Sequence, residues 1–392
     1  MKSKYKLIRT STVSTSLVSF LEPSIEILKS KYNLVLLSSP DKDLDYLGDK
    51  YDVVVYGVAM HRRMSPIQDL ISLLKLIKVF RKEKPYMVHS MTPKAGLLCM
   101  LAAWITRVPR RVHTFTGLVW PTATGLTRKI LMATDWLTCA CATHIIPEGK
   151  GVMNDLQQHI THKPMKVLGY GNVRGIDMNY WRKTNASSNK LREIKRDDVF
   201  TFIFVGRIVR DKGINELIAA FDKLSQEHKV RLLLVGTFED ALDPVSESTK
   251  KIIEGNSSIE YLGPQYGTDL LACYAASDCF AFPSYREGFP NTVLEAGAME
   301  LPSIVTDING SREIIVCKNE ENTSPIKDMK LCDNGIIIPP RNEELLFKAM
   351  EEVFKNDDLR SAMATLARKM VASRFEQSFV QKCLIEFYNE II

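Results

Sequence analysis

The sequence predicts an α/β protein made of two Rossmann-like domains, each built around a mostly parallel sheet. Three observations carry this prediction. Short apolar runs alternate with helical patterns along the whole chain, which is typical of βαβ units. The 392 residues exceed the usual size of one domain. A polar segment without periodicity, 181–190, lies near the middle of the chain and divides it into domains 1–185 and 186–392.

Each predicted strand is a short run rich in branched and aromatic residues, as buried strands of parallel sheets are. In the first domain these runs cover 6–10, 34–38, 53–56, 87–90, 112–115, 144–146 and 166–168. In the second domain they cover 201–205, 231–235, 259–262, 279–282, 303–305 and 335–338. The last helix of the chain is a candidate for packing back on the first domain. Ligands of such sheets bind outside the C-terminal ends of the strands.

The charge of the chain is distributed unevenly between its halves. Residues 1–185 hold 27 Lys+Arg and 13 Asp+Glu, a net charge of +14, whereas the remainder holds 25 and 33, a net charge of −8. A basic first domain suggests an anionic partner, either phospholipid headgroups or nucleic acid. The alternative is that its charges are dispersed over a solvated face. The basic half has no recognition helix or aromatic-interleaved patch, so a nucleic acid is not expected.

One predicted helix, 65–84, is a candidate for that anionic contact, and Pro66 suits its first turn. Apolar residues recur along it at helical spacing: Ile67, Leu70, Ile71, Leu74 and Ile77. Cations crowd its C-terminal end: Lys75, Lys78, Arg81, Lys82 and Lys84. One interpretation is a basic amphipathic face near anionic lipid. The other is a surface helix packed on its own sheet, with cations at the negative end of its dipole.

The cysteines and the apolar runs predict the compartment. Eight cysteines lie mostly in apolar runs without a C-x-x-C pair, which indicates reduced, buried thiols rather than a disulfide framework or a zinc site. The longest apolar stretch, 97–105, is far short of the roughly 20 residues that span a bilayer. The N-terminus lacks the apolar region of a signal peptide. We therefore expect a cytoplasmic protein, peripheral on the inner face of the cell membrane.

Two acids eight positions apart, Glu287 and Glu295, mark the candidate site of the second domain. Glu287 follows the predicted strand 279–282 on a loop, and Glu295 lies in the first turns of a predicted helix, 292–299. Carboxylates accept hydrogen bonds from sugar or ribose hydroxyls, and Gly288 lets backbone N–H groups approach a ligand closely. The start of the helix favours anions. The alternative is a solvated loop residue and a helix-surface residue.

A second motif follows the first strand of the same domain. Gly206 ends that strand, and Arg207 and Lys212 lie five apart before the next predicted helix. An Arg can hold a pair of phosphate oxygens bidentately, and a Lys supplies a point charge. The motif therefore predicts a diphosphate site, with ordinary loop charge as the alternative.

These two motifs resemble the family-4 retaining glycosyltransferases of GT-B fold, in which two Rossmann-like domains face a central cleft. The resemblance rests on 206–213 and on 283–295 with its Glu-x7-Glu spacing. It implies that Arg207 and Lys212 bind the diphosphate of a nucleotide sugar, that Glu287 lies by the donor sugar and that Glu295 binds the ribose hydroxyls. It also implies that a short backbone segment lines the pocket: Gly288, Phe289, Pro290 and Asn291.

The first half, through 89–96 and 112–117, resembles the subgroup that extends polyprenyl-diphosphate-linked glycans or builds capsular and O-antigen units. In the wider family a histidine at a strand end reaches the donor sugar. His113 matches it best, and His89 is interpreted as structural, although either could be a hydrogen-bonded strand-end residue. Lys94 could contact an acceptor phosphate or be solvated. Many relatives have a Gly-Gly turn where this chain has 11–15, whose hydroxyls could bind a sugar or cap the next helix.

The resemblance implies a retaining enzyme that moves a hexose or N-acetylhexosamine from a nucleoside-diphosphate sugar, expected to be UDP-linked, to a polyprenyl-diphosphate-linked glycan of a surface polysaccharide. The first domain would bind the acceptor and the second the donor. The expected catalytic residues are His113, Glu287, Arg207 and Lys212. No Asp-x-Asp lies beside the diphosphate motif, so transfer is expected to need no metal and no cofactor beyond the sugar nucleotide.

Two alternatives remain open from the sequence. A nucleotide-sugar epimerase or hydrolase on the same scaffold would turn over the donor without an acceptor. The second alternative is a catalytically silent binding subunit of a polysaccharide assembly complex, which would neither transfer the sugar nor turn over the donor. Such a subunit would have no need to keep four residues together: Arg207, Lys212, Glu287 and Glu295.

Overall fold

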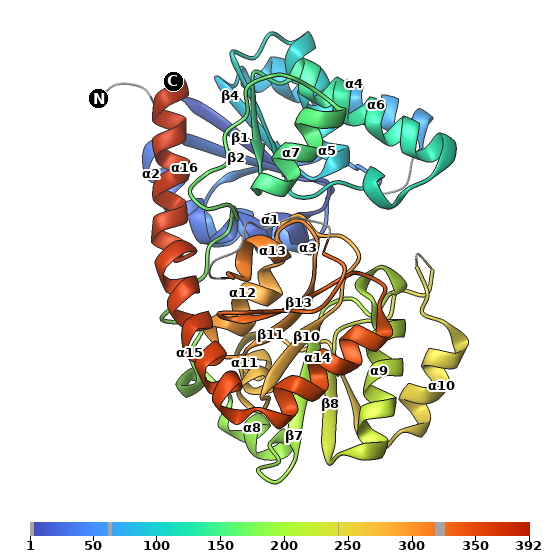
Figure 1. Ribbon diagram of the computed structural model, residues 1–392. Coiled ribbons are helices and arrows are strands. Elements are labelled where there is room, and N and C mark those ends of the chain that lie inside the picture. Colours follow the sequence, from blue (N-terminus) through green and yellow to red (C-terminus); the bar gives the residue numbers. More distant parts are fainter. Residues whose placement is uncertain (1–3, 62–64, 242, 318–325) are drawn as a thin grey trace. The chain divides into compact units, whose positions relative to one another are not determined.

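The computed structural model describes residues 4–61, 65–241, 243–317 and 326–392, and it divides into two compact units (Figure 1). The first unit comprises Met1–Gly175 and Gln377–Ile392, and the second comprises Ile176–Glu376. The division thus falls at residue 175 rather than 185, because Ile176 and Trp181 pack in the core of the second unit.

The first unit contains a six-stranded sheet in the order β3-β2-β1-β4-β5-β6, and every pair of neighbours is parallel. Its strands are β1 Lys6–Thr10, β2 Asn33–Ser38, β3 Val54–Gly57, β4 Met87–Met91, β5 Arg110–Phe115 and β6 His144–Pro147. The strand expected at 166–168 is wrong. Only an isolated bridge from Met165 to Ile145 forms there, because the chain turns away at Gly169 and Gly171, both with positive φ.

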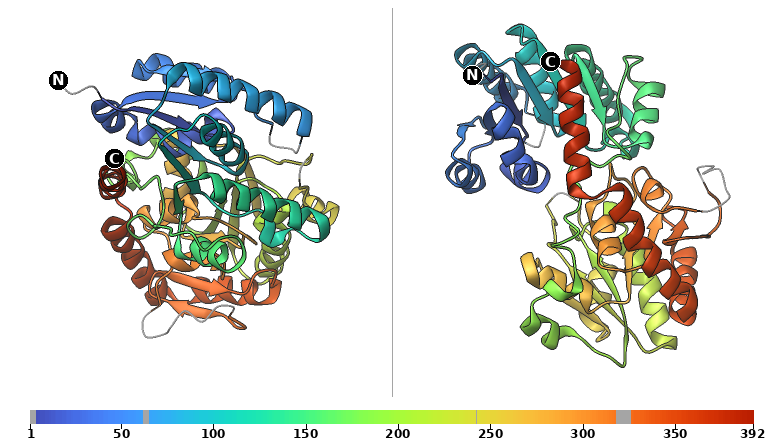
Figure 2. Two further views of the ribbon diagram at one scale, coloured as in Figure 1. Left: turned by 90° about the horizontal axis from the view of Figure 1, so that it is seen from above. Right: turned by 90° about the vertical axis from the view of Figure 1, so that its left-hand side faces the viewer.

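Helices cover both faces of this sheet. They are α1 Ser14–Phe20, α2 Ile25–Lys31, α3 Lys42–Tyr51, α4 Pro66–Glu83, α5 Pro93–Ile105, α6 Gly125–Cys141, α7 Lys150–His159 and α16 Gln377–Ile391. Alternate residues of each strand face opposite cores: Ile8 packs with the cluster under α4 to α7, whereas Leu7 packs with the cluster under α1, α2, α3 and α16. The C-terminal helix α16 thereby belongs to the first unit (Figure 2).

The second unit contains a seven-stranded sheet in the order β12-β13-β11-β10-β7-β8-β9, parallel except for the edge strand β12. Its strands are β7 Phe200–Val205, β8 Val230–Val235, β9 Ile259–Gly263, β10 Cys279–Phe282, β11 Ser303–Thr306, β12 Lys330–Cys332 and β13 Gly335–Ile338. The six strands predicted in this half are confirmed. β12 was not predicted, because three residues are too few to show a strand pattern.

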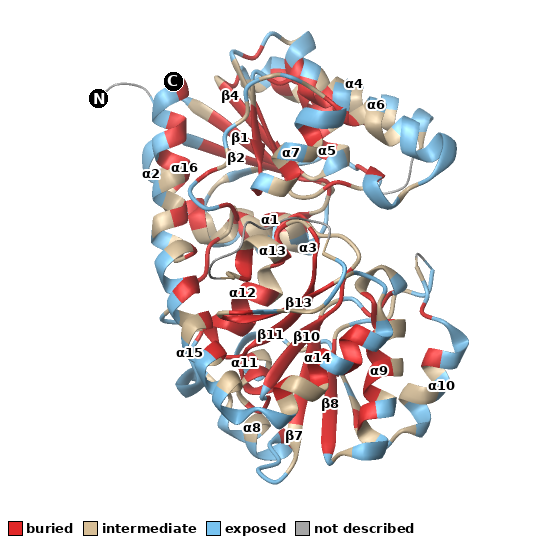
Figure 3. Cartoon of the chain, in the orientation of Figure 1, coloured by how far each residue is buried: buried red, intermediate tan, exposed pale blue. Residues whose placement is uncertain are grey.

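The helices of the second unit are α8 Ser188–Ile194, α9 Ile214–Glu227, α10 Glu247–Gly255, α11 Gly267–Ala275, α12 Asn291–Ala298, α13 Ser311–Ile314, α14 Glu343–Lys355 and α15 Asp357–Arg374. α8 begins inside 181–190, the segment expected to be without periodicity, and ends four residues beyond it. Ser187 caps it, its side chain accepting a hydrogen bond from the Lys190 N–H, and Ile194 anchors it in the core. Most of the strands and helices have buried inner faces (Figure 3).

The expectation that all eight cysteines are free thiols is wrong for one pair. Cys317 and Cys332 form a disulfide with their Cα atoms 4.3 Å apart, and next to it the Asp333 N–H donates a hydrogen bond of 2.8 Å to the Val316 carbonyl oxygen. The other six are free, and five of them are buried. No helix among the described residues is long and apolar enough to cross a membrane.

Candidate active site

The two predicted motifs of the second unit meet at one place in its sheet. β7 has β8 on one side and β10 on the other, so the strand order reverses between β7 and β10. The carboxyl ends of strands at such a switch point form the ligand site of doubly wound folds. Arg207 and Lys212 follow the end of β7, and Glu287 follows the end of β10. The topology therefore places the loop that follows β7 beside the loop that follows β10.

Lys212 ends a single 3-10 turn, Arg210–Lys212, and its ammonium contacts Oε1 of Glu287. Both side chains are mostly buried, with 14% and 15% of their surface exposed. The next residue, Gly213, has φ +71°, and a Cβ there would lie 2.1 Å from the carbonyl oxygen of Pro283. Only glycine allows the loop after β7 to pack so closely on the loop after β10.

Glu287 is held from the sheet side as well. The hydroxyl of the buried Ser284 donates a hydrogen bond of 2.8 Å to the carboxylate oxygen that Lys212 contacts. Thr306, at the end of β11, donates in turn to the carbonyl oxygen of Ser284. Tyr285 donates its backbone N–H to the carbonyl oxygen of Asp211 at 2.9 Å. The loop after β10 is thus tied to both neighbouring strand ends, which fixes the position of Glu287.

Arg207 is the more exposed cation of the site. Its Nη1 lies 2.7 Å from Oε2 of Glu239, which follows β8, and 44% of its side chain is exposed. An ion pair this exposed contributes little to stability. The guanidinium can therefore exchange Glu239 for a phosphate at small cost. Gly206 precedes it, and a Cβ on Gly236 would lie 1.8 Å from the Gly206 carbonyl oxygen, so the two strand ends pack closely.

The segment from Gly288 to Asn291 leads into α12. Phe289 is buried and packs against Phe375 with ring centroids 5.3 Å apart. A Cβ on Gly310, which has φ +73°, would lie 2.5 Å from the carbonyl oxygen of Gly288. The loop before α13 therefore presses directly on this backbone and restricts its conformation. Pro290 precedes α12, and the positive end of the helix dipole there favours an anion.

Glu295 lies inside α12 and is only 6% exposed. Its Oε2 accepts a hydrogen bond of 3.4 Å from the hydroxyl of Tyr274. The interpretation of Glu295 as a helix-surface residue is therefore wrong. A buried carboxylate needs polar partners.

His113 belongs to the first unit, so it is described apart from these residues. It lies near the end of β5, is 1% exposed, and its Nδ1 shares a hydrogen bond of 2.8 Å with the Ser90 hydroxyl. Burial lowers the pKa of His113 to about 3, so its imidazole is neutral at physiological pH. A Cβ on Gly96 would lie 2.4 Å from the ring, so α5 packs directly on it.

His89 lies in the core of the same unit. Its Nδ1 lies 3.1 Å from a guanidinium nitrogen of Arg9, and its Nε2 lies 2.7 Å from the Thr114 hydroxyl. Burial, followed by the charge of Arg9, holds the pKa of His89 well below its usual range. Both ring nitrogens are therefore occupied inside the unit, which agrees with a structural role.

Two further expectations for the first unit change. Lys94 is not solvated: its ammonium lies 2.5 Å from Asp69, and its side chain is 12% exposed. The hydroxyls of 11–15 do not cap α1, whose N-cap is Val13 without a side-chain bond. Thr12 instead shares a hydrogen bond of 2.8 Å with Thr92. The loops after β1 and β4 are thus joined at the switch point of the first sheet.

Sequence reasoning missed three residues of the site in the second unit: Ser284, Glu239 and Gly310. Ser284 lies within the motif 283–295, three positions before Glu287. That short spacing could have indicated a hydrogen bond between the two side chains. Glu239 contacts Arg207, and Gly310 contacts Gly288, only because of the order of the strands in the sheet. The order of the strands cannot be read from the sequence pattern.

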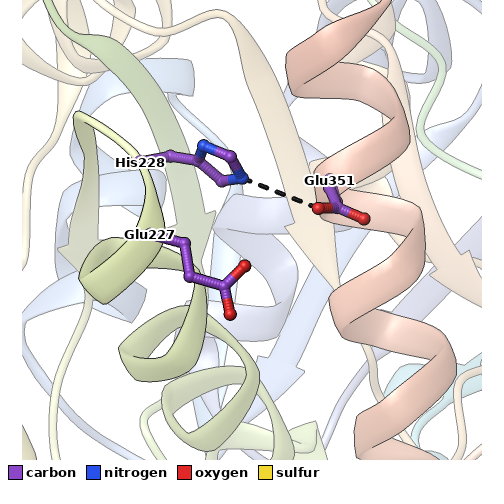
Figure 4. A group of neighbouring side chains, drawn as sticks. All are labelled: Glu227, His228 and Glu351. Carbon is purple, nitrogen blue, oxygen red and sulfur yellow. Dashed lines mark ion pairs between the residues drawn. The ribbon is translucent and has the colours of Figure 1, made fainter.

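One group among the described residues has the composition of a metal site: Glu227, His228 and Glu351 (Figure 4). It precedes β8, so it lies at the end of the sheet opposite to Arg207 and Lys212. His228 pairs with Glu351 at 3.6 Å, and Lys355 pairs with the same carboxylate at 2.6 Å. The Lys355 ammonium already neutralises Glu351, so we interpret the group as an ion-pair cluster.

Comparisons with known proteins agree with this geometry. The model of "Glycosyl transferases group 1" matches residues 187–370, and that of "Glycosyltransferase Family 4" matches 26–171. The chain is 31% identical to the capsular polysaccharide biosynthesis glycosyltransferase CapM of Staphylococcus aureus, over 99% of this chain and 97% of that protein.

A second relative is the UDP-Gal:alpha-D-GlcNAc-diphosphoundecaprenol alpha-1,3-galactosyltransferase of Escherichia coli. It is 27% identical over 70% of this chain and 71% of its own length. Among solved structures, Anabaena HepE in complex with UDP and glucose superposes with a TM-score of 0.78 at 16% identity, covering 98% of this chain and all of that one. The chain therefore belongs to family 4 of the glycosyltransferases and has their GT-B fold.

Proposed function

We propose that this glycosyltransferase moves a hexose or N-acetylhexosamine from a UDP-sugar to a polyprenyl-diphosphate-linked glycan during the synthesis of a capsular or related surface polysaccharide. The second unit would bind the donor and the first the acceptor. The observation that carries the donor side is the contact between Lys212 and Glu287 at the β7–β10 switch point.

In this proposal the cations of the second unit receive the diphosphate. The exposed Arg207 guanidinium leaves Glu239 and binds phosphate oxygens bidentately, while Lys212 supplies a charge from a largely buried position. The N–H groups at the start of α12 add to the positive potential. Positive charge fixed in place before the reaction stabilises the leaving group without reorganisation. Together these groups could neutralise the diphosphate, and we propose that no metal is needed.

We propose that the anomeric configuration is retained through a same-face displacement. The bond between the anomeric carbon and the diphosphate oxygen breaks, and the acceptor hydroxyl bonds to that carbon from the same side. Its proton passes to the departing diphosphate. Glu287, held by Ser284 and Lys212, would hydrogen-bond the donor sugar and face its developing positive charge. Glu295 would bind the ribose hydroxyls, and His113, as a neutral imidazole, would contact the sugar.

The names of relatives support the acceptor class. The Escherichia coli galactosyltransferase is named for a diphosphoundecaprenol-linked acceptor. So is a Campylobacter jejuni N-acetylgalactosaminyltransferase, 22% identical over 97% of this chain. The basic first half of the chain suits work on the anionic inner face of the cell membrane.

The test is transfer from a panel of radiolabelled UDP-sugars to polyprenyl-diphosphate-linked glycan extracted from membranes. Label should enter the lipid fraction with at least one donor, with and without a divalent-metal chelator. Lys212→Ala should abolish most of this transfer, while Lys251→Ala, which removes an exposed cation of α10, should not. Donor turnover without an acceptor would contradict the proposal in favour of a hydrolase or epimerase.

A further inference from the structure

The outer face of α4 is apolar although it does not pack on the sheet. Four of its residues are more than 40% exposed and recur at helical spacing: Ile67, Leu70, Ile71 and Leu74. The opposite side of the helix buries Leu76 and Phe80 in the core. The interpretation that the apolar residues of this helix simply pack on their own sheet is therefore wrong for these four.

The two neighbouring helices extend this apolar surface. α5 lies between α4 and α6, and all three cover the same face of the first sheet, so their outer sides face the same way. Large apolar residues are exposed on both: Trp104, Ile105, Leu126, Ile130 and Trp136. Exposed residues are prominent on α4 and α6 in Figure 3. We call these five residues, with the four of α4, the outer apolar face. So many exposed large apolar residues on one layer indicate an interaction site.

The charges beside this face have one sign. Exposed cations stand on or next to the three helices: Lys75, Lys78, Arg81, Lys82, Arg107, Arg128 and Lys129. Lys75, Lys78 and Arg81 have no ion-pair partner among the residues that the structure describes. The cations of this layer are therefore available to an external anion.

The acids of the same helices are withdrawn from solvent. Asp69 is paired with Lys94 at 2.5 Å, and Glu83 with Lys6 at 2.8 Å. The third, Asp135, is buried. No exposed, unpaired carboxylate of α4, α5 or α6 therefore offsets the cations.

We infer that the outer apolar face and its flanking cations dock on an anionic phospholipid surface. The apolar side chains enter the headgroup layer, where Trp is favoured, and the cations contact the lipid phosphates. A second copy of this chain fits less well, because a two-fold interface would set these cations against one another. Docking on the membrane would bring the enzyme to its lipid-linked acceptor. Only the identity of that acceptor rests on the proposed function, whereas the docking itself does not.

The experiment is sedimentation of the full chain with vesicles at 0.1 M salt. One set is pure phosphatidylcholine, and the other contains about a quarter phosphatidylglycerol. Two variants alter only exposed side chains: Leu70→Ser with Leu74→Ser, and Lys75→Gln with Lys78→Gln and Arg81→Gln. The matched control makes the same charge change on the second unit: Lys251→Gln, Lys327→Gln and Lys369→Gln.

The chain should bind the anionic vesicles more tightly than the neutral ones. The basic triple variant should lose on the order of 100-fold in partitioning, since each cation near such a surface contributes about fivefold. The Leu70 and Leu74 variant should lose at least tenfold, whereas the control should change little. Equal binding of the wild type to both vesicle types, or unchanged binding of both variants, would overturn the inference. A shift of the Leu70 and Leu74 variant from dimer to monomer would overturn it in favour of a self-interface.

Vesicle binding needs neither a donor nor an acceptor, so its failure is distinct from failure of the proposed transfer. Both variants should bind UDP like the wild type and keep transfer to a detergent-solubilised acceptor. Their transfer to an acceptor embedded in anionic vesicles should fall.

Discussion

Lys212 and Glu287 contact each other across the point at which the strand order of the second sheet reverses. Neither side chain could hold this position alone, because each stands on a loop that the other loop supports. Gly213 packs on Pro283, and Ser284 hydrogen-bonds Glu287. The pair is therefore organised before a ligand arrives, and that organisation is what an electrostatic site requires.

Replacing Lys212 by Ala should lower kcat/KM for transfer by about 100-fold or more, because one fixed charge facing a developing anion contributes on the order of 2–4 kcal/mol. In the proposed donor complex, its loss also leaves Glu287 facing the diphosphate as an uncompensated charge. The double variant Lys212→Ala with Glu287→Ala should therefore be less impaired than the sum of the two single changes. Steady-state kinetics of the four proteins measures the coupling. Strict additivity would contradict a functional contact between the two side chains.

Gly213→Ala should destabilise the second unit and weaken UDP binding, because the new Cβ would collide with the Pro283 carbonyl oxygen at 2.1 Å. Gly267→Ala is a matched control: φ is +57° there, and nothing lies within 4 Å of the added Cβ. Both changes carry the left-handed backbone penalty of about 1–2 kcal/mol, and only the first adds the collision. Thermal melts and UDP titration compare them. Equal melting temperatures would mean that the two loops do not pack as described.

Much of the fold can be predicted from apolar runs, because a short apolar run such as Cys279–Phe282 is stable mainly as a buried strand. The strand predicted at 166–168 was wrong, because the apolar character of a segment does not show whether another strand is close enough to pair with it. The two motifs of the candidate site are local in sequence, so they can be read from it. The Arg207–Glu239 pair depends on β7 and β8 being neighbours, and the Cys317–Cys332 disulfide depends on where the chain folds back after α13. The pattern of a single sequence does not contain that information.

Glu295→Ala should weaken UDP binding by about 10–100-fold, since hydrogen bonds to a charged group contribute roughly 1.5–3 kcal/mol. The affinity for UDP should fall more than the affinity for inorganic diphosphate, because the proposed contact is with ribose. Tyr274→Phe removes the hydroxyl that hydrogen-bonds Glu295 and should give a smaller loss of the same kind. Isothermal titration with both ligands measures this. An equal loss for both ligands would place Glu295 near the phosphates instead.

His113 should contribute no step to the pH–rate profile between pH 5 and 8, because burial lowers its pKa to about 3. Its effect on stability has a definite sign. The unfolded chain binds a proton on this histidine near its ordinary pKa of 6.5, whereas the folded chain does not until about pH 3. The free energy of unfolding therefore falls as pH drops from about 6.5 to 3.

His113→Asn should reduce this fall, and it should lower kcat if the ring contacts the donor sugar. Denaturant melts at several pH values and the pH profile of kcat check both statements. A transfer rate that follows a histidine-like pKa in the wild type and not in the variant would contradict a neutral His113.

Asp135 should make the first unit less stable as pH rises. Burial raises the pKa of this α6 carboxyl to about 7 from an unfolded value of 3.8, so the folded chain keeps a proton that the unfolded chain loses. The free energy of unfolding therefore falls between about pH 4 and 7 through this group. Asp135→Asn should remove that fall. The difference in the free energy of unfolding between the variant and the wild type should therefore increase by up to about 4 kcal/mol from pH 4 to pH 8. Asp49→Asn, on an exposed position of α3, is the control and should follow the wild-type curve. Parallel pH–stability curves for all three proteins would mean that Asp135 ionises in the folded unit as readily as in the unfolded chain.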